Sequence, residues 1–135
     1  MTRDQKYKRS YAEVLLRIAA EDFSTLEIIY RAKGGRKENV CFMAQQVVEK
    51  CLKALLVRGG VPVPFTHSTE LLLARLDVAD HPPQASSLDA LTEYATIRRY
   101  EEGHVELDAA DLQAAFESAR TTLEFCKSRI LPAPG

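Results

Sequence analysis

The sequence predicts an all-α protein, an antiparallel up-and-down bundle of four to five helices with one short helix. Three observations favour this fold class. Apolar residues recur at intervals of three and four over several long segments, which is the period of an amphipathic helix. Glycine pairs and proline-containing stretches separate these segments. The alternation of apolar and polar residues that is typical of a strand never persists.

The first half of the chain holds two predicted helices. The first runs from about residue 10 to residue 32, and the second spans about residues 39–58; a Gly-Gly pair follows each of them. The expected buried positions of the first helix are Ala12, Leu15, Leu16, Ala19, Phe23, Leu26 and Ile29. Those of the second are Val40, Ala44, Val47, Val48, Cys51 and Leu55. Residues 61–64 must be extended, because proline disfavours helix in the residue before it.

A short helix and a longer one are expected in the middle of the chain. The short helix should begin at Thr66 or His67, and a loop with a Pro-Pro pair follows it. Its apolar positions are Leu71, Leu72 and Leu76. Ser86 or Ser87 should then cap a fourth helix that reaches Arg99.

The last helix has the clearest signals. Asp108, with Asp111 three residues further on, resembles a capping box and predicts its start. Its apolar stripe is expected at Leu112, Ala115, Phe116, Ala119, Leu123, Cys126 and Ile130. A Pro-Ala-Pro-Gly tail follows this helix.

Size and composition indicate one globular domain over residues 1–135, with its core over about residues 8–130. The chain is 46% hydrophobic and 27% charged, which argues against disorder. Its net charge of -1 argues against a general polyanion binder, although a local basic cleft does not depend on the total. No apolar run approaches the roughly 20 residues that span a membrane, and the polar N-terminus resembles no signal peptide. We therefore expect a cytoplasmic protein without membrane contact.

The three cysteines are expected to be structural. Cys41, Cys51 and Cys126 lie inside apolar helical patterns, which indicates buried thiols in a reducing compartment. The sequence has no Cys-x-x-Cys pair and no histidine-rich cluster, so no metal site is predicted.

A candidate site lies in the segment Ile97-Arg98-Arg99-Tyr100-Glu101-Glu102-Gly103-His104. Arginine carries a permanent charge and a forked donor set suited to phosphate, and histidine moves protons near neutral pH. Together they suggest phosphodiester chemistry on RNA. In a continuous helix, residues five apart point about 140° from each other. Convergence of Arg99 and His104 therefore requires a break, which Gly103 permits.

Three segments together resemble the HEPN domain (higher eukaryotes and prokaryotes nucleotide-binding domain). Residues 46–55 match the helix Gln-x-x-Glu-Lys-x-x-Lys-Ala-Leu, typical of one bacterial and archaeal branch. The segment Pro64-Phe65-Thr66-His67 is similar to the Pro-x-Thr-His start of a short helix, and Arg99-Tyr100 is similar to an Arg-Tyr pair before the last helix of that branch. Order and spacing agree over about residues 8–130.

The resemblance implies a four-to-five-helix bundle that is usually a homodimer and is often encoded beside a minimal nucleotidyltransferase. Catalytic members of the family are metal-independent ribonucleases, many of them toxins, with an arginine, four to six residues and a histidine. Arg99 with four intervening residues before His104 fits this pattern, and Arg98 with five also fits. The implied function is an endoribonuclease, the toxin half of a toxin–antitoxin pair with the nucleotidyltransferase, that needs no cofactor or metal.

Under this interpretation each candidate residue has a role. Arg99 steadies the scissile phosphate, and His104 removes the ribose 2'-hydroxyl proton or protonates the leaving oxygen. The expected substrate contacts, which would hold RNA or a nucleotide, are Arg98, Tyr100, Lys50 and Lys53. Tyr100 can stack on a base, and the two lysines can hold a phosphate.

Two other interpretations stay open, so the sequence does not decide whether the chain is an enzyme. One is a non-catalytic nucleotide-binding or adaptor module that completes the cleft of a nucleotidyltransferase. The other is a structural helical dimer, in which Arg99 pairs with a neighbouring glutamate at a helix end and His104 is an exposed loop residue. For Lys50 and Lys53 the alternative to ligand contact is a solvated helix face, with Glu49 and Lys53 forming an i,i+4 pair.

Overall fold

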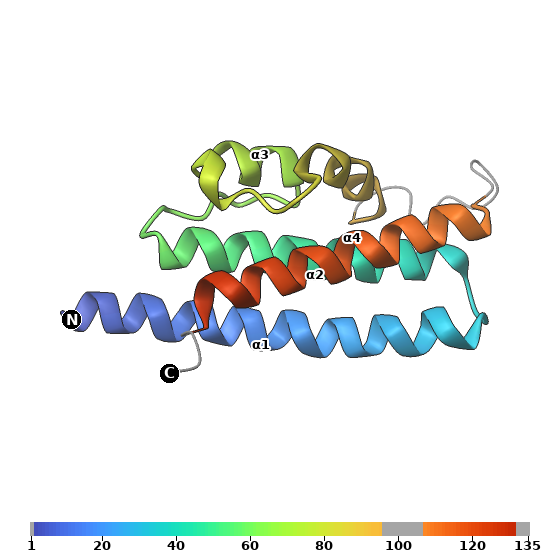
Figure 1. Cartoon of the computed structure of the whole chain (residues 1–135), viewed down its shortest axis with the longest axis horizontal. Helices are drawn as coiled ribbons and strands as arrows, with labels where there is room; N and C mark the ends of the chain where they lie inside the picture. The colour runs from blue at the N-terminus through green and yellow to red at the C-terminus, as the bar shows by residue number, and fades with distance from the viewer. Residues whose placement is uncertain (1, 96–106, 132–135) are drawn as a thin grey trace.

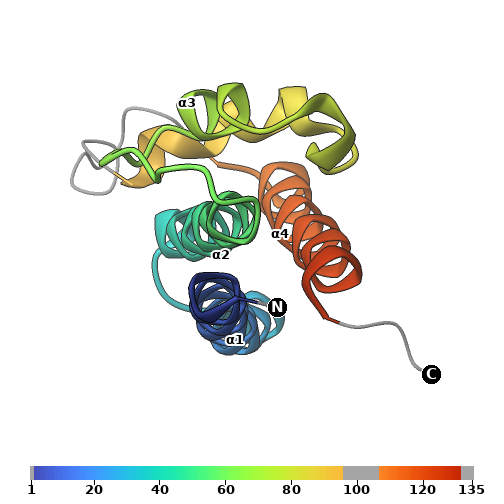
Figure 2. The same cartoon turned by 90° about the vertical axis from the view of Figure 1, so that its left-hand side faces the viewer.

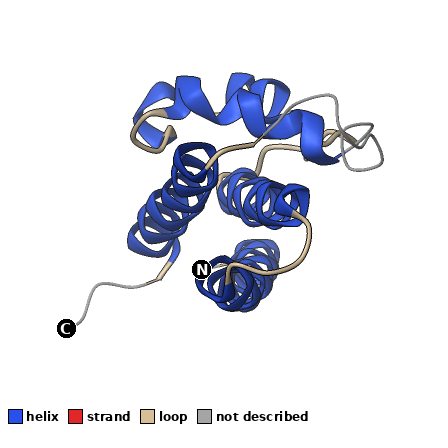
Figure 3. Ribbon diagram, turned by 90° about the vertical axis from the view of Figure 1, so that its right-hand side faces the viewer, coloured by secondary structure: helices blue, strands red, loops and turns tan. Residues whose placement is uncertain are grey.

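The described part of the protein is built of helices and contains no strand (Figure 3). The computed structural model describes the backbone of residues 2–95 and 107–131. The three long helices are α1 (Arg3–Ala32), α2 (Lys37–Arg58) and α4 (Ala109–Ile130). Between α2 and α4 lie the short helix α3 (Thr69–Ala74), the 3₁₀ turn η1 (Val78–Asp80) and the 3₁₀ helix η2 (Ala85–Ala95). The predicted all-α fold class is confirmed.

The elements form an up-and-down bundle in which α2 is the central helix. α1 runs in one direction, and α2 and α4 run back (Figure 1). α3 and η2 form a layer on the side of α2 that faces away from α1 (Figure 2). They take the fourth position of the bundle, so α2 contacts α1, α3, η2 and α4.

Helix α2 is buried on nearly all sides because of this central position. The six positions predicted from its apolar stripe are all buried, which confirms the stripe. Six further residues are buried as well: Cys41, Gln45, Glu49, Leu52, Ala54 and Leu56. The layer made by α3 and η2 covers the face that a one-sided helical pattern assigns to solvent. Two polar side chains, Gln45 and Glu49, are therefore enclosed in the fold.

The starts of α1 and α4 follow from side-chain capping. α1 begins well before the predicted residue 10, because Thr2 and Gln5 form a reciprocal capping box with hydrogen bonds of 3.1 and 2.8 Å. The capping box predicted for α4 is confirmed. Asp108 Oδ1 accepts from the Asp111 amide at 2.9 Å, and Asp111 Oδ2 accepts from the Asp108 amide at 3.0 Å.

The short helix α3 begins after Ser68, whose Oγ accepts a hydrogen bond from the Leu71 amide at 3.2 Å. The predicted starts at Thr66 and His67 were too early. The backbone leading into Ser68 is extended, and Thr66 Oγ1 accepts a hydrogen bond from the Ser68 amide at 3.0 Å. A hydroxyl at position 66 therefore orders the chain just outside the helix rather than capping the helix itself.

The fourth predicted helix is a 3₁₀ helix, η2, and the predicted serine cap is wrong. The helix begins at Ala85, so Ser86 and Ser87 lie inside it, and Ser87 Oγ donates to the Gln84 carbonyl at 2.7 Å. With three residues per turn, Leu88 and Leu91 lie one above the other. Both are buried, so the 3₁₀ helix presents them together to the core. The predicted extension to Arg99 lies outside the described residues.

The apolar stripes predicted for the first and last helices are confirmed, since every member is buried or packs half-buried against the core. Phe116 of α4 joins the two helices: its ring lies 4.5 Å from that of Tyr30 and 5.3 Å from that of Phe23. None of the helices in the described residues combines the length and apolar character required to cross a membrane.

Candidate functional site

The predicted catalytic segment belongs to the stretch of sequence between η2 and α4. Four predicted site residues fall outside the described residues: Arg98, Arg99, Tyr100 and His104. Beyond this stretch the chain is firmly held, because Leu107 is 6% exposed and its carbonyl oxygen accepts a hydrogen bond from Lys37 Nζ at 3.0 Å. This contact ties the residue before α4 to the first turn of α2.

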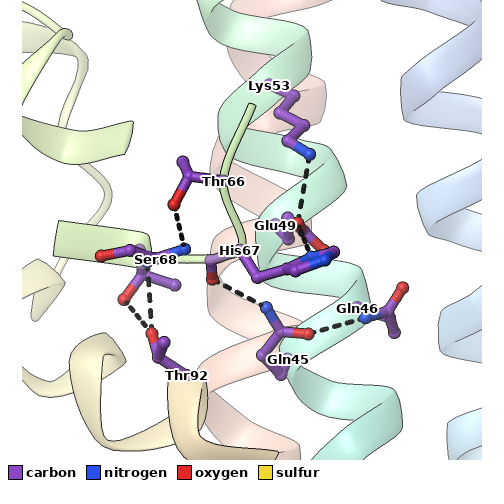
Figure 4. Close-up of polar contacts among 9 residues, drawn as sticks. Gln45, Gln46, Glu49, Lys53, Thr66, His67, Ser68 and Thr92 are labelled. Atoms are coloured by element: carbon purple, nitrogen blue, oxygen red, sulfur yellow. Dashed lines mark hydrogen bonds and ion pairs between the residues drawn. The ribbon is translucent and has the colours of Figure 1, made fainter. Parts of the chain in front are cut away.

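The most enclosed charged side chain of the described residues is Glu49, which is 3% exposed (Figure 4). Its Oε1 accepts a hydrogen bond from Lys53 Nζ at 3.1 Å, and His67 Nδ1 lies 2.6 Å from the same oxygen. A buried carboxylate is stable only when charged or hydrogen-bonding groups surround it. Glu49 has two such partners, one on its own helix and one on the segment that leads into α3.

Gln45 makes a second contact between α2 and the segment before α3. Its side chain is fully buried, and its Nε2 donates to the His67 carbonyl at 3.2 Å. Gln46 Nε2 in turn donates to Gln45 Oε1 at 2.8 Å (Figure 4). The segment before α3 is thus fixed through both the side chain and the backbone of His67.

A second polar pair holds the start of α3 against η2. The Thr69 amide donates to Thr92 Oγ1 at 3.2 Å, and the two hydroxyl oxygens lie 3.1 Å apart (Figure 4). Thr69 is fully buried. Two of the segments that carry the family resemblance, the glutamine–glutamate helix and the Pro-x-Thr-His segment, therefore meet in one structural network.

The two predicted phosphate-binding lysines have carboxylate partners within the fold. Lys50 pairs with Asp22 of α1, and Lys53 pairs with Glu49. The side chains of Lys50 and Lys53 are 28% and 25% exposed. An ammonium group has three donors, so each lysine can contact a phosphate only while sharing its charge with the carboxylate beside it. Their role in substrate binding stays a prediction.

Both histidines of the described residues have structural partners. His67 contacts Glu49 as above, and its side chain is 58% exposed. His81 Nε2 lies 2.8 Å from the Leu73 carbonyl and 3.3 Å from the Leu76 carbonyl. The Leu73 carbonyl belongs to the last turn of α3, where acceptors can take a donor from outside the helix, and the Leu76 carbonyl lies just beyond the helix end. His81 therefore closes the end of this short helix.

The three cysteines are buried thiols, as predicted from the helical pattern. The hydrogen bond with the Cys126 side chain raises the pKa of the Cys51 thiol well above its ordinary value, and burial raises it further. Cys126 Sγ itself donates to the Cys51 carbonyl at 3.5 Å. A neutral, enclosed thiol is a poor nucleophile, so Cys51 serves packing between α2 and α4.

The described residues offer no group of three or more His, Cys, Asp or Glu side chains that could hold a metal ion. Glu49 was expected on a solvated face of the second helix, and the apolar pattern did not single out Gln45, yet both side chains are buried. One feature of the sequence could have indicated a buried Glu49. The Pro-x-Thr-His motif predicts that an extended segment carrying a histidine follows α2, and a buried carboxylate on α2 is a suitable partner for that histidine.

Comparison with models of known protein families matches the HEPN domain over residues 12–129. The match covers most of the chain, so the chain belongs to the HEPN domain family, as the resemblance implied. The branch associated with minimal nucleotidyltransferases stays a prediction. Neither the curated proteins nor the solved structures gave a match.

Proposed function

We propose that this HEPN-domain chain cleaves RNA and is the toxin half of a toxin–antitoxin pair with a minimal nucleotidyltransferase. The observation that carries the proposal is the spacing of Arg99 and His104, with four residues between them, inside the family match over residues 12–129. This spacing agrees with the arginine–histidine pattern of catalytic members. Arg98, with five intervening residues, is the second arginine available to the same phosphate.

The proposed chemistry uses the 2'-hydroxyl of the RNA as its nucleophile. His104 removes the hydroxyl proton or protonates the leaving oxygen, and Arg99 stabilises the charge that develops on the phosphate. Because the nucleophile belongs to the substrate, no metal-bound water has to be generated. Tyr100 stacks on a neighbouring base, and Arg98, Lys50 and Lys53 contact flanking phosphates.

The other histidines support the choice of His104. His67 and His81 both contribute to the fold, one beside Glu49 and the other at the end of α3. Of the three histidines in the sequence, this leaves His104 for chemistry. The reaction needs one general base and one general acid. Each copy of the chain contributes a single histidine, His104, to this chemistry. A homodimer would supply both, in agreement with the family's usual assembly.

The test is cleavage of a defined RNA by the purified full-length chain in the presence of a metal chelator. We expect cleavage, and we expect His104→Ala to reduce its rate by about 10²–10⁴-fold, the usual contribution of general acid–base catalysis. Arg99→Ala should reduce it to a similar degree. The matched control is Arg75→Ala, which removes an exposed arginine at the end of α3 and should leave the rate unchanged.

Equal cleavage by the parent chain and by His104→Ala, purified identically, would overturn the catalytic proposal and point to a contaminating nuclease. The adaptor interpretation predicts a different result, namely binding of a nucleoside triphosphate without RNA turnover. It is favoured by the resemblance of residues 46–55 to a branch encoded beside nucleotidyltransferases. Co-purification with a nucleotidyltransferase encoded beside this chain would test the partner in either case.

A further inference from the structure

A cavity of about 360 Å³ lies at the end of the bundle where the turn between α1 and α2 meets the start of α4. We call it the basic-end cavity. Ile29 and Tyr30 of α1 and Leu112 of α4 form its apolar wall, and Lys33 and Lys37 line it from the turn. It is separate from the network around Glu49, and of the predicted site residues that the structure describes, neither Lys50 nor Lys53 lines it.

The charge of the basic-end cavity is of one sign. Lys33 and Lys37 contribute two cations, and none of the described residues that line it carries a carboxylate. The cavity between η2 and α4 has the opposite character, with Asp111 and Glu117 and no lysine or arginine among its described lining. Two like charges that share one cavity attract an anion more strongly than either of them alone.

Lys37 is positioned for such an anion by a contact within the fold. Its Nζ donates one hydrogen bond to the Leu107 carbonyl at 3.0 Å. An ammonium group has three donors, so further donors are available to a ligand. The hydrogen bond holds the side chain near the cavity, which lowers the entropy lost on binding.

The apolar wall is preformed. The Tyr30 ring stacks on Phe116 with centroids 4.5 Å apart and planes within 8°. Phe116 is 5% exposed, so it gives Tyr30 a rigid support. In the turn, Gly35 has a φ of 76°, a conformation that glycine adopts without strain. A rigid apolar surface beside two cations suits a ligand with a flat apolar part and an anionic part.

We infer that the basic-end cavity binds an organic phosphate with a flat apolar body, of which a nucleoside monophosphate is the simplest example. A phosphate monoester carries about -1.5 to -2 charges near pH 7, which matches two lysines. The cavity volume is at the lower end of the range for small-ligand sites, roughly 300–1,000 Å³, so it suits one nucleotide. The group can come from a free nucleotide or from one residue of an RNA. Only the RNA source rests on the proposed function; binding of a free nucleotide does not require cleavage.

The first experiment titrates the isotopically labelled full-length chain with AMP, adenosine and inorganic phosphate, and follows the amide signals of Gly34 and Gly35. We expect AMP to bind at least about tenfold more tightly than either fragment, because only AMP engages both the lysines and the apolar wall. A short RNA with a terminal phosphate distinguishes the two sources of the bound phosphate. If the RNA competes with AMP for the same amide signals, the cavity binds a residue of an RNA. If it does not compete, the cavity binds a free nucleotide. Equal affinity for AMP and inorganic phosphate would overturn the inference.

Variants separate the two cavity features. Lys33→Ala and Leu112→Gln should each weaken AMP binding about five- to tenfold, the first through charge and the second through the apolar wall. Lys37→Ala should do the same, but it also removes the contact with Leu107, so Lys33→Ala is the cleaner variant. The matched control is Lys8→Ala, a lysine that lines a different cavity beside Tyr7 and Tyr11. If Lys33→Ala weakens AMP binding no more than Lys8→Ala does, the basic-end cavity is not the binding site.

The outcome for this cavity is distinguishable from the outcome for the catalytic proposal. Cleavage of RNA with no binding of AMP would refute the cavity and leave the ribonuclease. Binding of AMP that depends on Lys33, without any cleavage, would refute the ribonuclease and leave the cavity as a nucleotide site.

Discussion

Replacing Glu49 tests whether one enclosed carboxylate holds the segment before α3 on α2. Its Oε1 has two partners, Lys53 Nζ at 3.1 Å and His67 Nδ1 at 2.6 Å. A hydrogen bond to a charged group contributes about 1.5–3 kcal/mol. The partner side chains are 25% and 58% exposed, so solvent weakens both contacts. We therefore expect Glu49→Ala to lower the free energy of unfolding by about 2–3 kcal/mol, less than the sum of two full contacts.

The assay is urea unfolding at neutral pH, followed by far-ultraviolet circular dichroism, with the slope against urea compared between variants. Glu49→Gln keeps the shape and one acceptor oxygen but not the charge, so we expect a loss of about 1 kcal/mol. Glu21→Ala, an exposed glutamate on α1, is the control and should stay within about 0.5 kcal/mol of the parent. A Glu49→Ala variant as stable as the Glu21→Ala control would refute the role assigned to this carboxylate.

Two further predictions concern helix ends and thiols. Asp108→Ala removes the N-cap of α4 and should lower the free energy of unfolding by about 1 kcal/mol, whereas Asp108→Ser should retain most of it; equal losses in urea unfolding would contradict the capping role. Because the pKa of Cys51 is raised in the fold, the unfolded chain releases this proton at lower pH than the folded one. Its contribution to stability is therefore complete below the ordinary thiol pKa and is lost at alkaline pH, and the loss should be smaller in Cys51→Ala. Iodoacetamide at about pH 8 should alkylate Cys51 in urea and not in the native chain, and rapid native alkylation would show that the thiol is accessible.

The sequence was sufficient where a local pattern decides the structure. The Asp108–Asp111 box and the apolar stripes of α1 and α4 depend on spacings of three and four residues, which a single segment displays in full. The same reasoning placed residues 61–64 outside any helix, since proline acts on its immediate neighbour. It overlooked Thr2 and Gln5, because their capping box precedes the apolar stripe by which the first helix was recognised.

Sequence reasoning failed where a distant segment decides the environment. Glu49 belongs to an arc of α2 that a helical pattern assigns to water, but the segment before α3 covers it through His67, 18 residues further along the chain. The 3₁₀ form of η2 is a similar case. Leu88 and Leu91 satisfy a period of three as well as one of 3.6, and packing against α2 and α3 selects between them.

The segments by which the chain resembles its family therefore differ in what they do: some stabilise the fold, and one is proposed to carry the chemistry. Glu49 and His67, in two of these segments, contact each other and stabilise the fold, whereas Arg99 and His104 are proposed for chemistry. Membership of the family rests on the match over residues 12–129 and is compatible with a nuclease or an adaptor. The two groups can be separated by mutation, because a structural contact and a catalytic group affect different observables. Glu49→Ala should lower the free energy of unfolding while the folded fraction retains its activity, and His104→Ala should reduce the cleavage rate by about 10²–10⁴-fold without lowering that free energy.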